Sequence, residues 1–347
     1  MKTRFSRLSV FLFSSLLVGT YTLADEIGMV TGSPTGTYIK FGYDIAGVAQ
    51  KAGLNIQVKE SQGSIDNINR MDSSENAAFG IVQSDVLGFL ARSDKANLKA
   101  VADKLRLVFP LYHEEVHLFA RKDIDRFEDL EGKRLILGVK GSGNWLTAMN
   151  LLQLLNVKPG ETIEDLPPPK AITAVLTGKA DAMIYVAGKP VELFSNLDKL
   201  KSEPEYAPLV EQVHFVRLDD RRLLKEYLPA GIAAGDYRWT GDDTPTIAVK
   251  ALLVSFDFSG KQTPYYRQRC RELATLGKAL RDNIDTLKQT GHPKWQEVDL
   301  EENVGIWKLD ACSRQSDKVL GQGGKPAPNR DIGRELENIL SKPAPRR

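Results

Sequence analysis

Residues 28–85 repeat one pattern three times: a short apolar stretch, a turn rich in glycine and hydroxyl side chains, and then apolar residues at helical spacing. The apolar stretches at 28–31, 55–58 and 77–82 predict strands. A helix between two strands returns the chain, so that the second strand runs in the same direction as the first. The pattern therefore predicts an α/β fold with a parallel sheet and helices on both of its faces.

The same alternation begins again near residue 105. Apolar spacing predicts a helix along 146–155, and the three prolines at 167–169 predict a loop. Residues 264–320 are predicted to be mainly helical, and the chain after Gly321 is rich in glycine, proline and charge. The further predicted strands are 106–109, 116–120, 134–139, 181–186 and 246–256.

Two α/β units in one chain predict two lobes joined by a hinge, with a ligand bound between them. In open α/β sheets, ligands bind beyond the carboxyl ends of the strands, where the strand-to-helix turns lie. We predict a first lobe at 25–118 plus 232–320, a second lobe at 119–231, and a C-terminal tail at 321–347.

The N-terminus has the features of an export signal. Three basic residues in the first seven positions precede an apolar run at 8–18, which is too short to span a bilayer comfortably. Small residues at Thr22 and Ala24 predict cleavage after Ala24 and a periplasmic location for the mature chain. The alternative is a signal anchor that is not cleaved.

Charge and cysteine content narrow the possible functions. The chain has 47 Lys and Arg against 45 Asp and Glu, which leaves no basic field for a nucleic acid. Its two cysteines are too few for a disulfide-dense scaffold or a cysteine-rich zinc module. In an oxidising compartment Cys270 and Cys312 are expected to pair. The alternative is two thiols that are buried separately.

Residues 113–117 spell H-E-x-x-H, the motif by which a helix presents two zinc ligands and a general base. Here Pro110 precedes the motif, and 116–120 is predicted to be a strand. On a strand, positions four apart are separated by about 13 Å. Because each zinc ligand must approach the metal to about 2.0–2.1 Å, we interpret these residues as the start of a strand. A zinc hydrolase stays the alternative.

Two glycine-rich turns are the candidate binding elements. The turn at 32–37 lacks the lysine of a phosphate-binding loop, and the turn at 141–144 lacks the third glycine of a dinucleotide fingerprint, since Leu146 stands there. Each turn precedes a predicted helix, whose free N–H groups and positive dipole end suit a carboxylate. The alternative is a plain tight connection.

These turns, taken in order, resemble the TAXI-type solute receptors of TRAP transporters. The matching fragments in the order of the chain are TGSPTGTY at 31–38, QGSIDN at 62–67, GIVQSD at 80–85, LEGKR at 130–134, GSG at 141–143, GKADA at 178–182, GKP at 188–190 and PAG at 229–231. Two departures occur: Ser33-Pro34 stands where the family has Gly-Gly, and Asn144-Trp145 replaces a smaller or acidic pair.

The resemblance implies a type II periplasmic-binding-protein fold and a receptor that works as a monomer, without a cofactor and without catalysis. It would deliver its ligand to the TRAP membrane subunits. Carried over by position, the ligand-binding residues would be Ser33, Thr37, Tyr38, Ser64, Asn67 and Gln83 on one lobe, and Ser142, Gly143, Asn144, Trp145, Tyr185 and Gly188 on the other.

We expect the ligand to be a small organic anion: a dicarboxylate, a 2-oxo acid or an acidic amino acid such as glutamate. Backbone N–H groups of the two turns would bind its carboxylate, and Tyr38 and Trp145 would cover its apolar part. A periplasmic sensor that reports to a membrane kinase is the other function open at this point, because such a protein would use the same cleft and differ in its docking surface.

Overall fold

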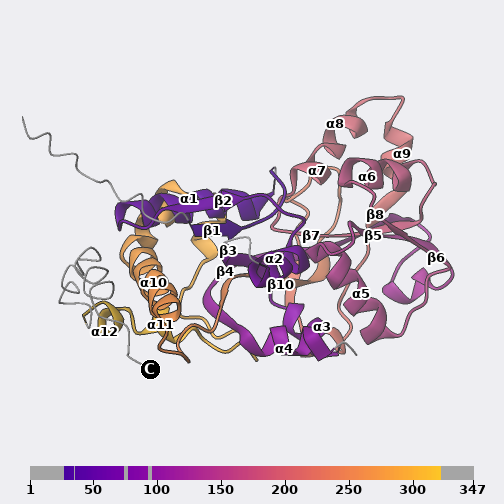
Figure 1. The fold of residues 1–347 in the computed structure, drawn as a ribbon. Coiled ribbons are helices and arrows are strands. Elements are labelled where there is room, and N and C mark those ends of the chain that lie inside the picture. The colour runs from indigo at the N-terminus through magenta and orange to yellow at the C-terminus, as the bar shows by residue number, and fades with distance from the viewer. Residues whose placement is uncertain (1–26, 35, 74–76, 93–95, 322–347) are drawn as a thin grey trace, which may run out of the picture.

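The computed structural model describes residues 27–34, 36–73, 77–92 and 96–321 (Figure 1). The predicted export signal, with its cleavage site after Ala24, lies outside these residues, and so does the tail from residue 322 onward. Within the described part of the chain, none of the helices combines the length and the apolar character needed to cross a membrane. The α/β class predicted from the sequence is confirmed, because strands and helices alternate along most of the described chain and the strands form one sheet.

The first repeats of the sequence pattern form the elements that were predicted. The strand β1 lies between β2 and β3 and pairs with both in parallel. Helix α1 buries Phe41, Ile45 and Ala49, whose four-residue spacing places them on one face. The elements are β1 (Ile27–Val30), α1 (Thr37–Lys51), β2 (Ile56–Lys59), α2 (Ser64–Asp72), β3 (Ala77–Gln83), α3 (Val86–Arg92) and α4 (Ala96–Lys104).

Two long strands, β4 (Leu105–Arg121) and β10 (Thr244–Phe256), run through both halves of the molecule. The first half consists of the elements β1–α4 and the chain after β10, and the second half is the chain between β4 and β10. The prediction of separate strands at 106–109 and 116–120 is wrong, because β4 continues through Pro110. Pro110 lies where the register with β10 shifts, and there a residue without an N–H is tolerated. Since β4 leaves the first half and β10 returns to it, β10 is antiparallel to both β3 and β4, and the sheet is not purely parallel as predicted.

The second half repeats the alternation. The expected loop at 167–169 is wrong in part, because helix α6 begins at Pro168. Proline suits the first helical turn, where its missing N–H has no intrahelical partner to lose. The elements are η1 (Phe127–Leu130), β5 (Arg134–Gly138), α5 (Gly143–Leu155), β6 (Glu161–Glu164), α6 (Pro168–Leu176), β7 (Ala182–Ala187), α7 (Glu192–Ser195), α8 (Leu197–Ser202), α9 (Ala207–Glu211), β8 (Val213–Phe215), η2 (Leu223–Lys225) and β9 (Leu228–Ile232).

One continuous sheet joins the halves, in the order β2-β1-β3-β10-β4-β7-β5-β6. Each half nevertheless has its own buried core, with Phe41 and Phe79 in the first and Phe119 and Phe194 in the second. In Figure 1 the first half lies at the left and the second half, which contains η1–β9, lies at the right. The residue boundaries of the two predicted lobes stay a prediction, because β4 and β10 belong to both cores.

The chain after β10 returns to the first half, where α10 (Pro264–Thr290) is its longest helix. The region from 291 to 310 is less helical than predicted, since it contains only the short η3 (Pro293–Glu297). Trp295 fixes this segment: its ring stacks on Phe41 at 4.4 Å, and its indole N–H donates to Asp44 at 2.8 Å. The last elements are α11 (Ala311–Arg314) and α12 (Ser316–Gly321).

The predicted disulfide is present. Cys270 on α10 is bonded to Cys312 on α11, with Cα atoms 5.2 Å apart. It ties the end of the described chain to the long helix of the first half.

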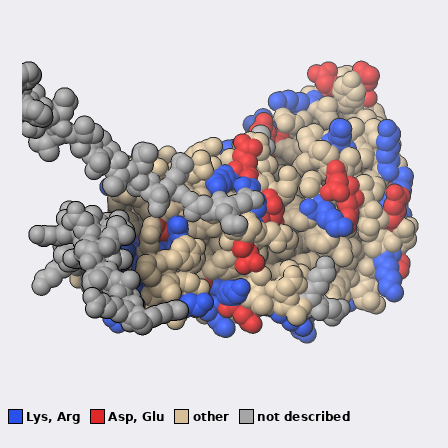
Figure 2. Space-filling view, in the orientation of Figure 1, with Lys and Arg blue, Asp and Glu red and all other residues tan. Residues whose placement is uncertain are grey.

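Acidic and basic side chains are mixed over the face seen in Figure 2. Among the described residues, ion pairs join Arg134 to Asp181 and Lys189 to Asp236. The visible face therefore has no broad basic area, as the balanced charge of the sequence predicts.

Candidate functional site

A cavity of about 380 Å³ lies between the two halves, at the strand-to-helix turns that the sequence singled out. Its walls include the turn after β1, the turn after β2 and the end of β3 from the first half, and the turn after β5 and strand β7 from the second. A cavity of this size suits a small molecule. The predicted residues that line it are Ser33, Thr37, Tyr38, Gln83, Ser142, Gly143, Asn144 and Tyr185.

Two helices from opposite halves begin at this cavity. Helix α1 follows Gly36, and no side chain caps its first turn. Helix α5 follows Ser142, whose hydroxyl accepts a hydrogen bond from the N–H of Trp145 at 3.2 Å. Gly141 makes the turn before α5 possible, because its φ of +82° is unfavourable for other residues. Both helices thus direct first-turn N–H groups and a positive dipole end toward one space.

Glu114 on β4 also lines the cavity, although the sequence analysis did not predict it as a site residue. The residue is only 5% exposed, and the Tyr38 hydroxyl donates to its Oε2 at 2.8 Å. Burial, with a smaller contribution from Glu115, raises the pKa of Glu114 to about 8. It is therefore mostly protonated at neutral pH. The signal that was overlooked is the pair of adjacent acidic residues, Glu114 and Glu115, in the middle of a long strand with many apolar residues.

The two halves are in contact around the cavity. A β-carbon on Gly143 would lie 2.4 Å from the side-chain oxygen of Gln83, which shows how closely α5 approaches β3. The Thr147 hydroxyl of α5 lies 3.3 Å from the same oxygen. The N–H of Ile65 on α2 donates to the carbonyl of Gly141 at 3.2 Å.

Asp85, which follows β3, adds a second group of contacts between the halves. Its Oδ2 accepts hydrogen bonds from Thr147 at 2.9 Å, Asn150 at 3.3 Å and Tyr227 at 3.1 Å, all in the second half. Burial raises the pKa of Asp85 to about 6, although these donors oppose the shift. Asp85 therefore holds α5 against the first half.

Ser64 and Asn67, two of the predicted ligand-binding residues, do not line the cavity. The Ser64 hydroxyl accepts from the backbone N–H of Gln83 at 3.0 Å. The side-chain amide of Asn67 donates to the carbonyls of Thr31 and Ile81, at 2.6 Å each. Both residues are fully buried and join strands of the first half, which a sequence motif does not distinguish from ligand contacts.

Trp145 and Gly188 also lie outside the lining, so the structure does not place the Trp145 ring over the cavity as expected. The indole of Trp145 donates to Glu164 on β6 at 2.8 Å, and its ring lies 5.8 Å from that of Phe89. A β-carbon on Gly188 would lie 2.6 Å from the Lys294 side chain, so this glycine allows close packing between the halves. One helical position separates Asn144 from Trp145, and that rotation turns the indole away from the cavity.

Asn67→Ala is expected to destabilise the protein without changing its ligand affinity. The substitution leaves two buried carbonyls, those of Thr31 and Ile81, without their donor, at a cost of about 2 kcal/mol in the free energy of unfolding. Urea unfolding measures the loss. The exposed Asn69→Ala in the same helix is the control and should change stability by less than about 0.5 kcal/mol. A selective loss of affinity in Asn67→Ala would instead make it a ligand contact.

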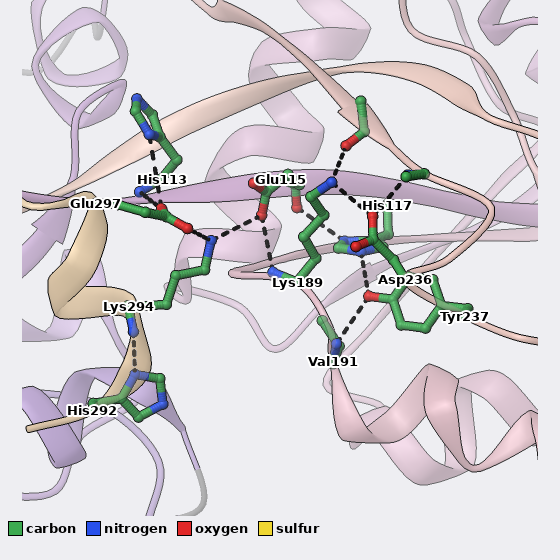
Figure 3. Close-up of polar contacts among 12 residues, drawn as sticks. His113, Glu115, His117, Lys189, Val191, Asp236, Tyr237, His292, Lys294 and Glu297 are labelled. Carbon is green, nitrogen blue, oxygen red and sulfur yellow. Dashed lines mark hydrogen bonds and ion pairs between the residues drawn. The ribbon is translucent and has the colours of Figure 1, made fainter.

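The H-E-x-x-H residues lie on strand β4 and not on a helix (Figure 3). Each has its own partners: the backbone N–H of His113 donates to Glu297 at 3.3 Å, and Glu115 forms an ion pair with Lys294 at 3.7 Å. His117 lies 2.8 Å from the Tyr237 hydroxyl, and burial lowers its pKa to about 4, so the ring is neutral. Nowhere in the described chain are three His, Cys, Asp or Glu side chains grouped as metal ligands. The geometry thus favours the strand interpretation over the zinc motif.

Comparison with known families identifies the chain. The profile of the NMT1-like family matches residues 29–305, which include both halves and every residue that lines the cavity. The chain belongs to the NMT1-like family.

Solved structures resemble this NMT1-like protein at low identity. The periplasmic binding protein BugD is 13% identical over 86% of this chain and 94% of its own, with a TM-score of 0.47. MatC from Rhodopseudomonas palustris, solved with bound malate, is 13% identical over 86% of this chain and 97% of its own, with a TM-score of 0.47. The periplasmic VFT2 domain of BvgS from Bordetella pertussis is 13% identical over 76% of this chain and 91% of its own, with a TM-score of 0.40.

Proposed function

We propose that this NMT1-like protein is an exported receptor that captures a small organic anion between its halves and delivers it to the membrane subunits of a TAXI-type TRAP transporter. The observation that carries the proposal is the meeting of α1 and α5, from opposite halves, at one cavity of ligand size. Their first turns offer N–H donors from both sides, so a bound carboxylate would hold the halves together.

The charge of the cavity determines how an anion would be held. None of the described residues that line it is Lys, Arg or His. A carboxylate would therefore depend on backbone N–H groups, on hydroxyls such as those of Ser33 and Thr37, and on two helix dipoles worth about 0.3–1 kcal/mol each. Such a site favours one carboxylate more than two, because a second negative charge would lack its own donors.

We propose binding without catalysis. The titratable groups in the lining are Glu114, Tyr38 and Tyr185, and the pKa of each is raised by burial. In their neutral forms these groups donate and accept hydrogen bonds but neither attack a ligand nor accept a proton from it readily at neutral pH. The ligand would leave the cleft chemically unchanged, as a transport receptor requires.

A thermal-shift panel tests the proposal. Purified mature protein is heated with dicarboxylates, 2-oxo acids, amino acids and sugars, each at millimolar concentration. At least one acid is expected to raise the melting temperature, because a ligand at about 100 times its Kd stabilises the native state by about 2.7 kcal/mol. The anion proposal would be contradicted if a sugar raised the melting temperature while no acid did.

A further inference from the structure

Glu114 is the only carboxyl group among the described residues that line the cavity, and no cation faces it there. It lies on β4, the strand that both halves share, and the Tyr38 hydroxyl donates to one of its oxygens. The Gln83 amide lies beside the same carboxyl group. The titratable groups with the main electrostatic effects between them and Glu114 are acids and phenols: Tyr38 on α1, Asp85 after β3, Tyr112 and Glu115 on β4, and Tyr185 on β7. A lysine near this group, Lys294, is paired with Glu115 and Glu297.

A buried carboxylate without a positive partner is costly, so Glu114 carries a proton in the free protein. A ligand that brings a positive group removes this cost. An ammonium group would pair with the Glu114 carboxylate and would lie beside the phenol rings of Tyr38 and Tyr185, which attract cations through their faces. A ligand with a second carboxylate at this place would instead require Glu114 to keep its proton.

We propose that Glu114 determines the specificity of the cleft by pairing with the ammonium group of an amino acid, so that amino acids are preferred over the same acids without the amino group. This inference rests on the proposed function, since the N–H groups of α1 and α5 hold the carboxylate of the same ligand. On binding, the O–H bond of Glu114 breaks, its proton passes to solvent, and the carboxylate that remains pairs with the ligand's ammonium.

The exchange of charge makes binding depend on pH. The pKa of Glu114 is about 8 in the free protein and falls in the complex with an amino acid. Affinity for an amino acid therefore rises with pH, by up to about tenfold per unit, and levels off near pH 8, while up to one proton is released. An acid without the amino group needs protonated Glu114, so its affinity falls as the pH rises through 8, and it releases no proton.

Isothermal titration calorimetry at pH 6.5 and 8.0, in two buffers of different ionisation enthalpy, measures affinity and released protons together. The probes are the twenty common amino acids, screened first by thermal shift, and for each the acid with hydrogen in place of the ammonium, for example L-glutamate with glutarate and L-leucine with 4-methylpentanoate. Glu114→Gln keeps the shape of the neutral side chain. Glu211→Gln, at an exposed position at the end of α9, is the matched control.

In the wild type and in Glu211→Gln, an amino acid is expected to bind at least about tenfold more tightly than its partner acid at pH 8.0, with proton release at pH 6.5. In Glu114→Gln both the preference and the proton release should be lost. Binding of acids with no preference for the amino form, or no proton release by the wild type, would overturn the role of Glu114 and leave the proposed function standing. If neither kind of acid binds, the proposed function fails, and this inference fails with it.

Discussion

Gly143→Val is expected to lower the affinity for the ligand by roughly 10- to 100-fold while the protein stays folded. A β-carbon at this position would lie 2.4–2.8 Å from the atoms of the Gln83 side-chain amide, which belongs to the opposite half. Overpacking a contact of this kind costs about 1–3 kcal/mol, and each 1.4 kcal/mol changes a binding constant about tenfold. Because the clash lies between the two halves, it opposes the contact that a ligand bound between them would require.

Calorimetric titration with whichever acid gives the largest thermal shift measures this loss, and circular dichroism checks the fold. Gly47→Val is the matched control, since Gly47 is exposed on α1 and a β-carbon there meets no atom within 4 Å. It should keep wild-type affinity. Unchanged affinity in Gly143→Val would contradict this prediction, and it would mean that the Gln83 side chain moves aside or that binding does not bring α5 against β3.

Removing the disulfide is expected to lower the free energy of unfolding by about 3–4 kcal/mol without changing ligand affinity. The bond between Cys270 and Cys312 closes a loop with a sequence separation of 42, and the estimate follows from the entropy that such a loop removes from the unfolded chain. For a chain of this size the loss corresponds to a fall of about 5–10 °C in melting temperature. Affinity should stay the same, because neither cysteine lines the cavity.

Differential scanning calorimetry of the double variant Cys270→Ala and Cys312→Ala measures the effect, beside the wild type with and without a reductant. Reductant should destabilise the wild type and leave the double variant unchanged. Backbone hydrogen bonds between Leu107 and the segment 308–310 hold the start of α11 independently of the bond. If the double variant melted with the wild type, those contacts would be sufficient and the disulfide would contribute little.

Much of the fold follows from local patterns. The apolar spacing of residues 28–85 is sufficient to predict β1, β2, β3 and the helices α1 and α2, because each element buries one face and its period is visible in the sequence. The glycine-rich turns predict where the cavity lies, since the carboxyl ends of parallel strands meet at one edge of a sheet. Tyr38 and Asn144, predicted from such turns, do line it.

The residues that were predicted to line the cavity but do not, and the strand that was predicted as two, have one cause in common. In each case a contact between segments that are distant in the sequence decides the outcome. Ser64 and Asn67 belong to a motif that resembles a binding turn, but their hydrogen bonds join backbone segments that are distant in the sequence. Trp145 follows a cavity residue directly, and the rotation of one helical position sends its side chain to β6. Pro110 suggests the end of a strand, yet the pairing with β10 continues past it.

The sequence by itself determined the α/β class, the positions of the turns, the balanced charge and the presence of two cysteines within one chain. These properties depend on neighbours along the chain or on composition. Only the tertiary structure decided that Glu114 lies in a cavity whose described lining includes no Lys, Arg or His, and that Gly143 lies against Gln83. The burial and pairing of a side chain depend on segments brought together by folding, and the residues adjacent to it in the sequence do not specify them.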